Sequence, residues 1–231
     1  MDEGKPGVLV TDAAGQAADP AFAAAAHGIL SALVRGGAAL GWLDPPPLAE
    51  VAALLRSVGE ASATGDGALR AAYLLPGSLI AAGSPAAVPG SPAGGEAEGG
   101  ARPAGGPPGG PPPPDRLIGL GYWTRYERPT HRMHADLRRI AVARHAQGRG
   151  AGRALTSALI DAARAARIEV LTLDARGDNT GALHLYRSLG FTEYGRLPGF
   201  VAVGERRYDT VLCCLDLRER PPGGTAAGGP A

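Results

Sequence analysis

Apolar residues in the first 75 positions follow two spacings, one typical of strands and one typical of helices. Short uninterrupted apolar runs predict strands, whereas apolar residues that recur every three or four positions predict amphipathic helices. An Asp followed by Pro precedes both helical stretches, at Asp19 and Asp44, and this pair suits an N-cap and a first helical position. The expected elements are a strand at 8–11, helices beginning near 20 and 48, and a strand at 68–75.

The segment 76–115 breaks this pattern. Of its 40 residues, 22 are Gly or Pro, and four consecutive prolines stand at 111–114. Such a composition buries too little apolar surface to offset the entropy lost on ordering. We expect a disordered insertion inside one domain, because the part before it, 1–75, would make a poor core alone. The alternative is a polyproline II ligand for a partner domain.

Regular patterns resume at 116 and continue to 218, which we expect to be the core of the same domain, followed by a disordered tail at 219–231. The expected elements are strands at 117–126 and 135–143, a helix after the glycines at 148–152, a strand at 168–173, a helix capped by the run Asp178-Asn179-Thr180, and strands at 191–194 and 208–217 with a loop between them. This order predicts an α/β (α+β) fold. It consists of one mixed sheet of about six to seven strands with helices on both faces.

Charge and composition exclude some classes of function. The chain has 231 residues and a net charge of +1, so no strong field attracts it to nucleic acid or to a membrane surface. It contains no apolar run of about twenty residues, and we expect a cytoplasmic protein. The adjacent Cys213 and Cys214 would point to opposite faces of a strand, so we expect no disulfide between them.

A glycine-rich turn stands between a predicted strand and a predicted helix, in the run Gln147-Gly148-Arg149-Gly150-Ala151-Gly152. The first N–H groups of a helix lack partners and the helix dipole is positive there, so this arrangement favours an anion. Arg149 and Arg153 add positive charge. The glycine spacing fits neither a dinucleotide fingerprint nor a P-loop. A tight turn without any ligand is the alternative.

Two motifs give the sequence a family resemblance. Gln147, Gly150 and Gly152 match Q/R-x-x-G-x-G/A, the acetyl-CoA pyrophosphate loop of the GNAT N-acetyltransferases. One helix and one strand later, the run from Asn179 through Tyr186 to Phe191 matches N-x-x-A-x-x-x-Y-x-x-x-G-F of the same superfamily. With both motifs at this separation, the chain resembles a GNAT enzyme over roughly 117–217.

The resemblance implies acetyl-CoA as co-substrate and no metal. The turn at 147–152 would hold the pyrophosphate, the strand before it would pair with the pantetheine arm, and Asn179 would contact that arm. The implied acetyl-CoA residues are Ile140, Ala141, Val142, Gln147, Gly148, Arg149, Gly150, Ala151, Gly152, Arg153 and Asn179.

Two residues are candidates for proton transfer. Tyr186 would protonate the departing CoA thiolate by resemblance, and one weak acid suffices for that leaving group; the alternative is a core aromatic. Asp136 lies eleven residues before Gln147, where the histone-acetylating branch of the family carries its general base. Its alternative is a strand residue paired with Arg138 or Arg139. The base could also be a water, or be shared with His134.

The acceptor and the partners are less constrained. His131, His134 and His145 give no sound metal-ligand set. Arg196, Arg206 and Arg207 surround a loop that borders the acceptor site in this fold; they could bind a substrate carboxylate or form local ion pairs. We expect an N-acetyltransferase that acts on a small-molecule amine or on a protein or peptide amine, and a homodimer is compatible with the resemblance. The alternatives are a non-catalytic acyl-CoA-binding module and an interaction protein that uses the proline-rich segment.

Overall fold

The computed structural model describes residues 7–75 and 111–218. The tail expected at 219–231 lies outside these ranges, as does the expected insertion apart from 111–115. Within them the strands and helices are, in chain order, β1 (Val8–Asp12), α1 (Pro20–Arg35), α2 (Leu48–Ala63), β2 (Gly67–Leu74), β3 (Leu117–Arg125), β4 (His134–Val142), α3 (Ala151–Ala165), β5 (Val170–Arg176), α4 (Thr180–Ser188), β6 (Thr192–Val203) and β7 (Arg206–Asp216).

The strands form one seven-stranded sheet in the order β1-β2-β3-β4-β5-β7-β6. Only β4 and β5 run parallel, and the other neighbours are antiparallel. The antiparallel pair β2 and β3 joins the two described segments, with Gly67 opposite Thr124. The expected mixed sheet in a single domain is therefore confirmed.

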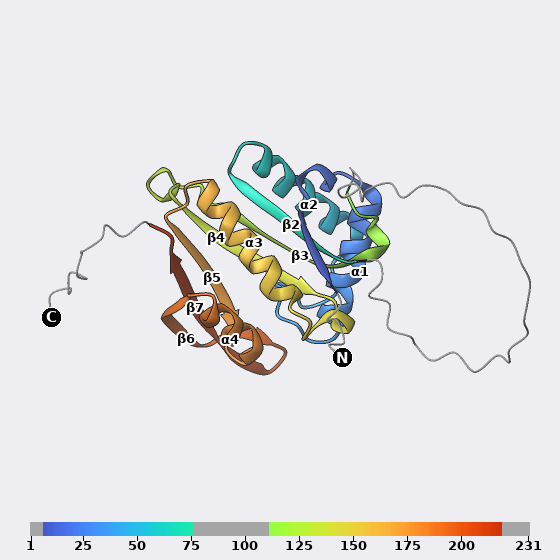
Figure 1. Ribbon diagram of the computed structural model, residues 1–231. Coiled ribbons are helices and arrows are strands. Elements are labelled where there is room, and N and C mark those ends of the chain that lie inside the picture. Colours follow the sequence, from blue (N-terminus) through green and yellow to red (C-terminus); the bar gives the residue numbers. More distant parts are fainter. Residues whose placement is uncertain (1–6, 76–110, 219–231) are drawn as a thin grey trace, which may run out of the picture.

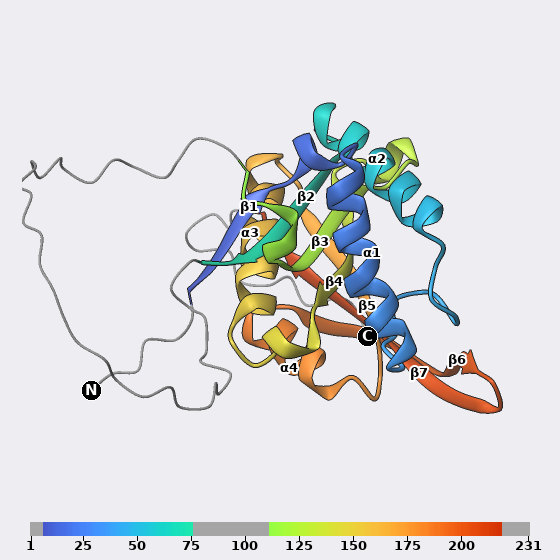
Figure 2. The ribbon, with the colours of Figure 1, turned by 90° about the vertical axis from the view of Figure 1, so that its right-hand side faces the viewer.

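Helices cover both faces of this sheet, with α1 and α2 on one face and α3 and α4 on the other (Figures 1 and 2). Each face has its own apolar core. On the first face Phe22 and Leu55 pack with the fully buried Leu69 of β2. On the second face Leu159 of α3 packs with Trp123, whose indole N–H donates to the carbonyl of Leu159 at 3.1 Å.

The start of α1 follows the sequence prediction and the start of α2 does not. Asp19 accepts a hydrogen bond from the Ala21 N–H at 2.9 Å, and Pro20 is the first residue of α1. At α2, by contrast, the N-cap is Pro47, which offers no side-chain bond. The expectation that Asp44 caps α2 was wrong, because three prolines separate it from the helix.

The prediction of a loop between 195 and 207 was also wrong, because β6 continues through most of these residues to Val203. The register against β7 shifts between Leu197 and Val201, which marks a bulge around Pro198-Gly199. Gly199 has a left-handed φ of 62°, and its N–H donates to the Asp209 carboxylate at 3.1 Å. The bulge lets the strand continue past a proline that has no N–H for the ladder.

Candidate functional site

The two parallel strands at the centre of the sheet are paired for only part of their length. His134, Ala135 and Asp136 of β4 pair with Val170, Leu171 and Thr172 of β5. Beyond that point β4 continues to Val142 and β5 to Arg176 without pairing to each other. The predicted residues Ile140, Ala141 and Val142 lie on this stretch of β4, so their side of the strand has backbone groups that an extended ligand can pair with.

A bulge in β4 accompanies this separation. The register against β3 shifts between Tyr122, opposite Arg138, and Leu120, opposite Ala141. Arg139 lies in the bulge with a left-handed φ of 50°, a conformation that is strained for a residue with a side chain. Its guanidinium lies 4.1 Å from the Trp42 ring centroid and donates to the Leu40 carbonyl at 3.1 Å. These contacts hold the bulge against the connection between α1 and α2.

The glycine-rich turn leads from the end of β4 into α3. Gly148 and Gly150 have left-handed φ values of 75° and 86°, and Gly150 is the N-cap of α3. No heavy atom lies within 4 Å of a Cβ built on either glycine, apart from their own neighbours, so the turn leaves the start of the helix open. As at any helix start, the first N–H groups have no acceptor within the helix.

Neighbouring side chains fix the position of this turn. The Gln147 amide donates to the Val142 carbonyl at 2.9 Å, which ties the turn back to β4. Arg153 donates to the Ser188 hydroxyl at 2.6 Å, which ties the first turn of α3 to the end of α4. The structure therefore brings the predicted residues of 147–153 together at one helix N-terminus, beside the unpaired part of β4.

Tyr186 projects from α4 into the second core, where its ring packs edge-to-face on Phe191 with centroids 5.8 Å apart. Burial raises the pKa of the Tyr186 phenol to about 12, with smaller contributions from Cys213 and from the negative charge of Asp174. The phenol is therefore protonated at any physiological pH. Asn179 is the N-cap of the same helix, because its carbonyl oxygen accepts from the Ala182 N–H at 3.3 Å.

Two aspartates lie where β4 and β5 separate. Asp136 accepts from Arg138 Nε at 2.6 Å and from the Thr172 hydroxyl at 3.2 Å, so the ion pair considered from the sequence is present. Asp174 was not predicted. The loss of water contact around its carboxyl group raises its pKa, the charge of Asp136 raises it further, and Arg138 opposes both.

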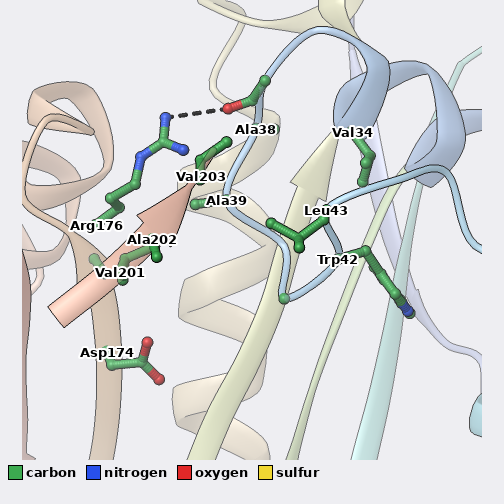
Figure 3. A pocket seen from close by; sticks show the side chains of 13 residues that line it. Val34, Ala38, Ala39, Trp42, Leu43, Asp174, Arg176, Val201, Ala202 and Val203 are labelled. Atoms are coloured by element: carbon green, nitrogen blue, oxygen red, sulfur yellow. Dashed lines mark hydrogen bonds between the residues drawn. The ribbon is translucent and has the colours of Figure 1, made fainter. Parts of the chain in front are cut away.

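Asp174 opens into a cavity of about 280 Å³ between β5, β6 and the connection from α1 to α2 (Figure 3). Asp174 and Arg176 are its charged residues, and Trp42 is its one aromatic lining residue. The other lining residues are small or aliphatic: Val34, Gly37, Ala38, Ala39, Gly41, Leu43, Ala175, Val201, Ala202 and Val203.

Other sequence candidates are not brought into this site. Among the described residues no group of three or more His, Cys, Asp or Glu could hold a metal ion, so His131, His134 and His145 form no such cluster. Arg196 pairs with Glu193 at 3.0 Å and Asp209 at 3.2 Å, and Cys213 and Cys214 are both free thiols. No helix in the described ranges has the length and apolarity that crossing a membrane requires.

Comparison with known proteins agrees with these features. Residues 114–191 match the model of the acetyltransferase (GNAT) family. Over 81 residues the chain is 38% identical to a mycothiol acetyltransferase of Tsukamurella paurometabola, a stretch that covers 35% of this chain and 27% of that protein. Over 83 residues it is 35% identical to a ribosomal protein bS18-alanine N-acetyltransferase of Escherichia coli, covering 36% of this chain and 56% of the relative. The shared stretch thus spans less than two thirds of either relative.

The fold extends the similarity beyond that stretch. A GNAT superfamily phosphinothricin acetyltransferase from Sinorhizobium meliloti, solved in complex with acetyl-CoA, superposes with a TM-score of 0.62 at 18% identity. The superposition covers 95% of this chain and 96% of that one. The family match thus shows similarity to the acetyltransferase (GNAT) family for residues 114–191, and the superposition shows that the chain shares the fold of that acetyltransferase.

Proposed function

We propose that this protein is an N-acetyltransferase that transfers the acetyl group of acetyl-CoA to a primary amine. One observation carries the proposal: the part of β4 that does not pair with β5 leads into the open N-terminus of α3, and the protonated Tyr186 lies near enough to Asp174 of β5 for that charge to raise its pKa. The names of the curated relatives and the acetyl-CoA complex of the solved neighbour support it.

The residues at this place suit acetyl-CoA. The turn at 147–152 presents helix N–H groups without side chains above them, and Arg149 and Arg153 add charge for a pyrophosphate. The part of β4 at 140–142 provides an open strand edge for the pantetheine arm. Asn179 uses its carbonyl oxygen to cap α4, which leaves its amide nitrogen as a donor to that arm. When bound, acetyl-CoA supplies an acyl group activated as a thioester.

The reaction needs two proton transfers around one nucleophilic attack. The acceptor arrives as an ammonium ion, and a carboxylate of the site removes one proton to expose the nitrogen lone pair. The amine then forms the C–N bond to the thioester carbonyl as the C–S bond breaks. Tyr186 donates its proton to the departing sulfur, and the second proton lost by nitrogen restores the phenol. The balance is one amide, one free thiol and one proton released to solvent.

Two carboxylates can act as the base, and they differ in their surroundings. Asp136, the residue expected from the sequence, is held by Arg138 and Thr172. Asp174 lies beyond it at the mouth of the cavity, and its raised pKa makes it a stronger base than an ordinary aspartate. We therefore assign proton removal to this pair, and the pH dependence of two variants distinguishes its members.

The test is release of free CoA thiol from acetyl-CoA across a panel of amines, with the wild type and Tyr186→Phe measured in parallel. We expect amine-dependent release that falls sharply in the variant, with acetyl-CoA affinity by calorimetry unchanged. Tight binding without release for any amine would identify a non-catalytic acyl-CoA-binding module. Absence of binding would overturn the assignment of 147–152 as a pyrophosphate site.

A further inference from the structure

We infer that the acceptor is a small primary monoamine with an apolar body and no carboxylate beside its nitrogen, and that Asp174 receives its ammonium group. This inference rests on the proposed function and goes further, because it assigns the cavity between β5, β6 and the α1–α2 connection to a chemical class of acceptor.

The size and lining of the cavity limit the body of the acceptor. Its volume of about 280 Å³ lies just below the usual range for small-molecule sites, which is about 300–1,000 Å³. Most of its wall is aliphatic side chain or glycine, and the Trp42 indole N–H already donates to Glu50 at 2.6 Å. A compact aliphatic or phenyl group fits such a wall, whereas a second charged group would lose its water without finding a partner there.

The cavity's one basic side chain is already paired with a carboxylate. Arg176 donates from Nε and Nη2 to the two carboxylate oxygens of Asp178, at 2.6 and 3.1 Å. Its Nη2 also donates to the Gly37 carbonyl at 3.1 Å (Figure 3), and its guanidinium carbon lies 4.4 Å from the Tyr208 ring centroid. The side chain is only 15% exposed. Arg176 therefore joins β5 to the end of α1 through Nε and Nη2, and its charge is already paired with Asp178, which disfavours a second carboxylate from a substrate.

The cavity's one acidic side chain is in the opposite situation. No other residue in the described ranges donates a hydrogen bond to the Asp174 carboxyl group, which points away from β5 toward the gap beside it (Figure 3). The nearby Asp136 and Arg138 balance each other in a 2.6 Å ion pair. With Arg176 likewise matched by Asp178, one negative charge remains uncompensated at the mouth of the cavity.

This charge pattern separates amines from amino acids. An ammonium group at Asp174 gains an ion pair, and its neutral body can enter the apolar cavity. An α-amino acid would bring its carboxylate close to Asp174, while the charge of Arg176 is already paired with Asp178, and such like-charge contacts are costly. Asp174 is also placed to take the ammonium proton before attack, so the same contact would serve binding and activation.

The test compares matched acceptors that differ only beside the nitrogen: 2-phenylethylamine, phenylalaninamide and phenylalanine, with 1,5-diaminopentane as an acceptor bearing a second charge. Acetyl-CoA binding is measured first. We expect kcat/KM for 2-phenylethylamine to exceed that for phenylalanine and for the diamine by at least about tenfold. In Asp174→Asn we expect the KM for 2-phenylethylamine to rise at least about tenfold, with the acetyl-CoA Kd unchanged and the discrimination against phenylalanine reduced.

A matched control is Asp161→Asn, which removes an exposed carboxylate of α3 that pairs with Arg164. This variant should leave unchanged the KM for 2-phenylethylamine and the preference for 2-phenylethylamine over phenylalanine. Equal or faster turnover of phenylalanine would overturn the inference while the acetyltransferase function stands. An unaltered KM for 2-phenylethylamine in Asp174→Asn would also overturn the inference. Faster turnover of phenylalaninamide than of the monoamine would overturn it in favour of a peptide N-terminus. Failure to bind acetyl-CoA would instead remove the proposed function itself.

Discussion

Asp174 lies two residues beyond Thr172, which is the β5 partner of Asp136 at the last pair before β4 and β5 separate. The two carboxylates are therefore on neighbouring strands at the start of the gap, close enough for the charge of Asp136 to raise the pKa of Asp174. Two acids whose surroundings differ in this way are a common arrangement in sites that move protons.

The pH dependence of turnover should identify which carboxylate removes the amine proton. If Asp174 is the base, kcat/KM should fall on the acidic side as pH drops through the raised pKa of Asp174. Asp174→Asn should abolish that limb. Asp136→Asn removes a negative charge that raises the pKa of Asp174, and it frees Arg138, whose positive charge lowers that pKa. The acidic limb of the profile should therefore move to lower pH in this variant. A limb lost in Asp136→Asn and kept in Asp174→Asn would make Asp136 the base.

Asp174 should also cost stability at neutral pH. Its pKa in the folded protein is raised above the ordinary value of 3.8, so the native state holds this proton more tightly than the unfolded chain does. Its favourable contribution is present below about pH 3.8 and is lost as pH rises through the raised pKa. We expect Asp174→Asn to have a higher Tm than the wild type at pH 7 and little difference at low pH, by calorimetry. A lower Tm at pH 7 would contradict this account.

Removing the Tyr186 hydroxyl should affect chemistry rather than binding. We expect Tyr186→Phe to lower kcat by about 10²–10⁴, the usual contribution of general acid catalysis, with little change in acetyl-CoA Kd or in Tm. The control is Tyr73→Phe. That hydroxyl donates to Gln16 at 2.8 Å in the first core, so its loss should destabilise by about 1–3 kcal/mol and leave kcat unchanged. Full activity in Tyr186→Phe would exclude the phenol as the acid.

Two glycine substitutions should have opposite effects on stability. Gly150 needs its left-handed φ of 86° at the start of α3, so Gly150→Ala should destabilise by about 1–2 kcal/mol and weaken acetyl-CoA binding as the turn shifts. Gly28 is exposed within α1 and has open space around its Cβ position. Gly28→Ala should therefore stabilise by about 0.5–1 kcal/mol, with no effect on binding. Urea unfolding measures the stability of both variants, and calorimetry measures their binding of acetyl-CoA. Equal changes in the free energy of unfolding would argue against backbone strain at Gly150.

The order of elements and the glycine turn could be predicted because they depend on local patterns, namely apolar periodicity and a short motif. Asp174 was missed because the expected strand ended at Leu173. The alternation itself continues further, with the buried Leu171, Leu173 and Ala175 separated by Thr172, Asp174 and Arg176. That alternation marks a polar row on the other face. The cavity could not be predicted, because it depends on three segments that only the tertiary fold brings together.

The bulge at Pro198-Gly199 has a consequence for the protein at high concentration. Among residues 7–75 and 111–218, β6 is the last strand of the sheet and no further strand pairs with its outer edge; exposed edges of this kind can pair with other chains, which is how sheets aggregate. The bulge at Pro198-Gly199 bends this strand, and the register shift between Leu197 and Val201 interrupts the regular spacing along it. A second strand would find matching partners only on either side of the bulge. We therefore expect the bulge at Pro198 to oppose edge-to-edge aggregation, even though Phe200 beside it is 68% exposed.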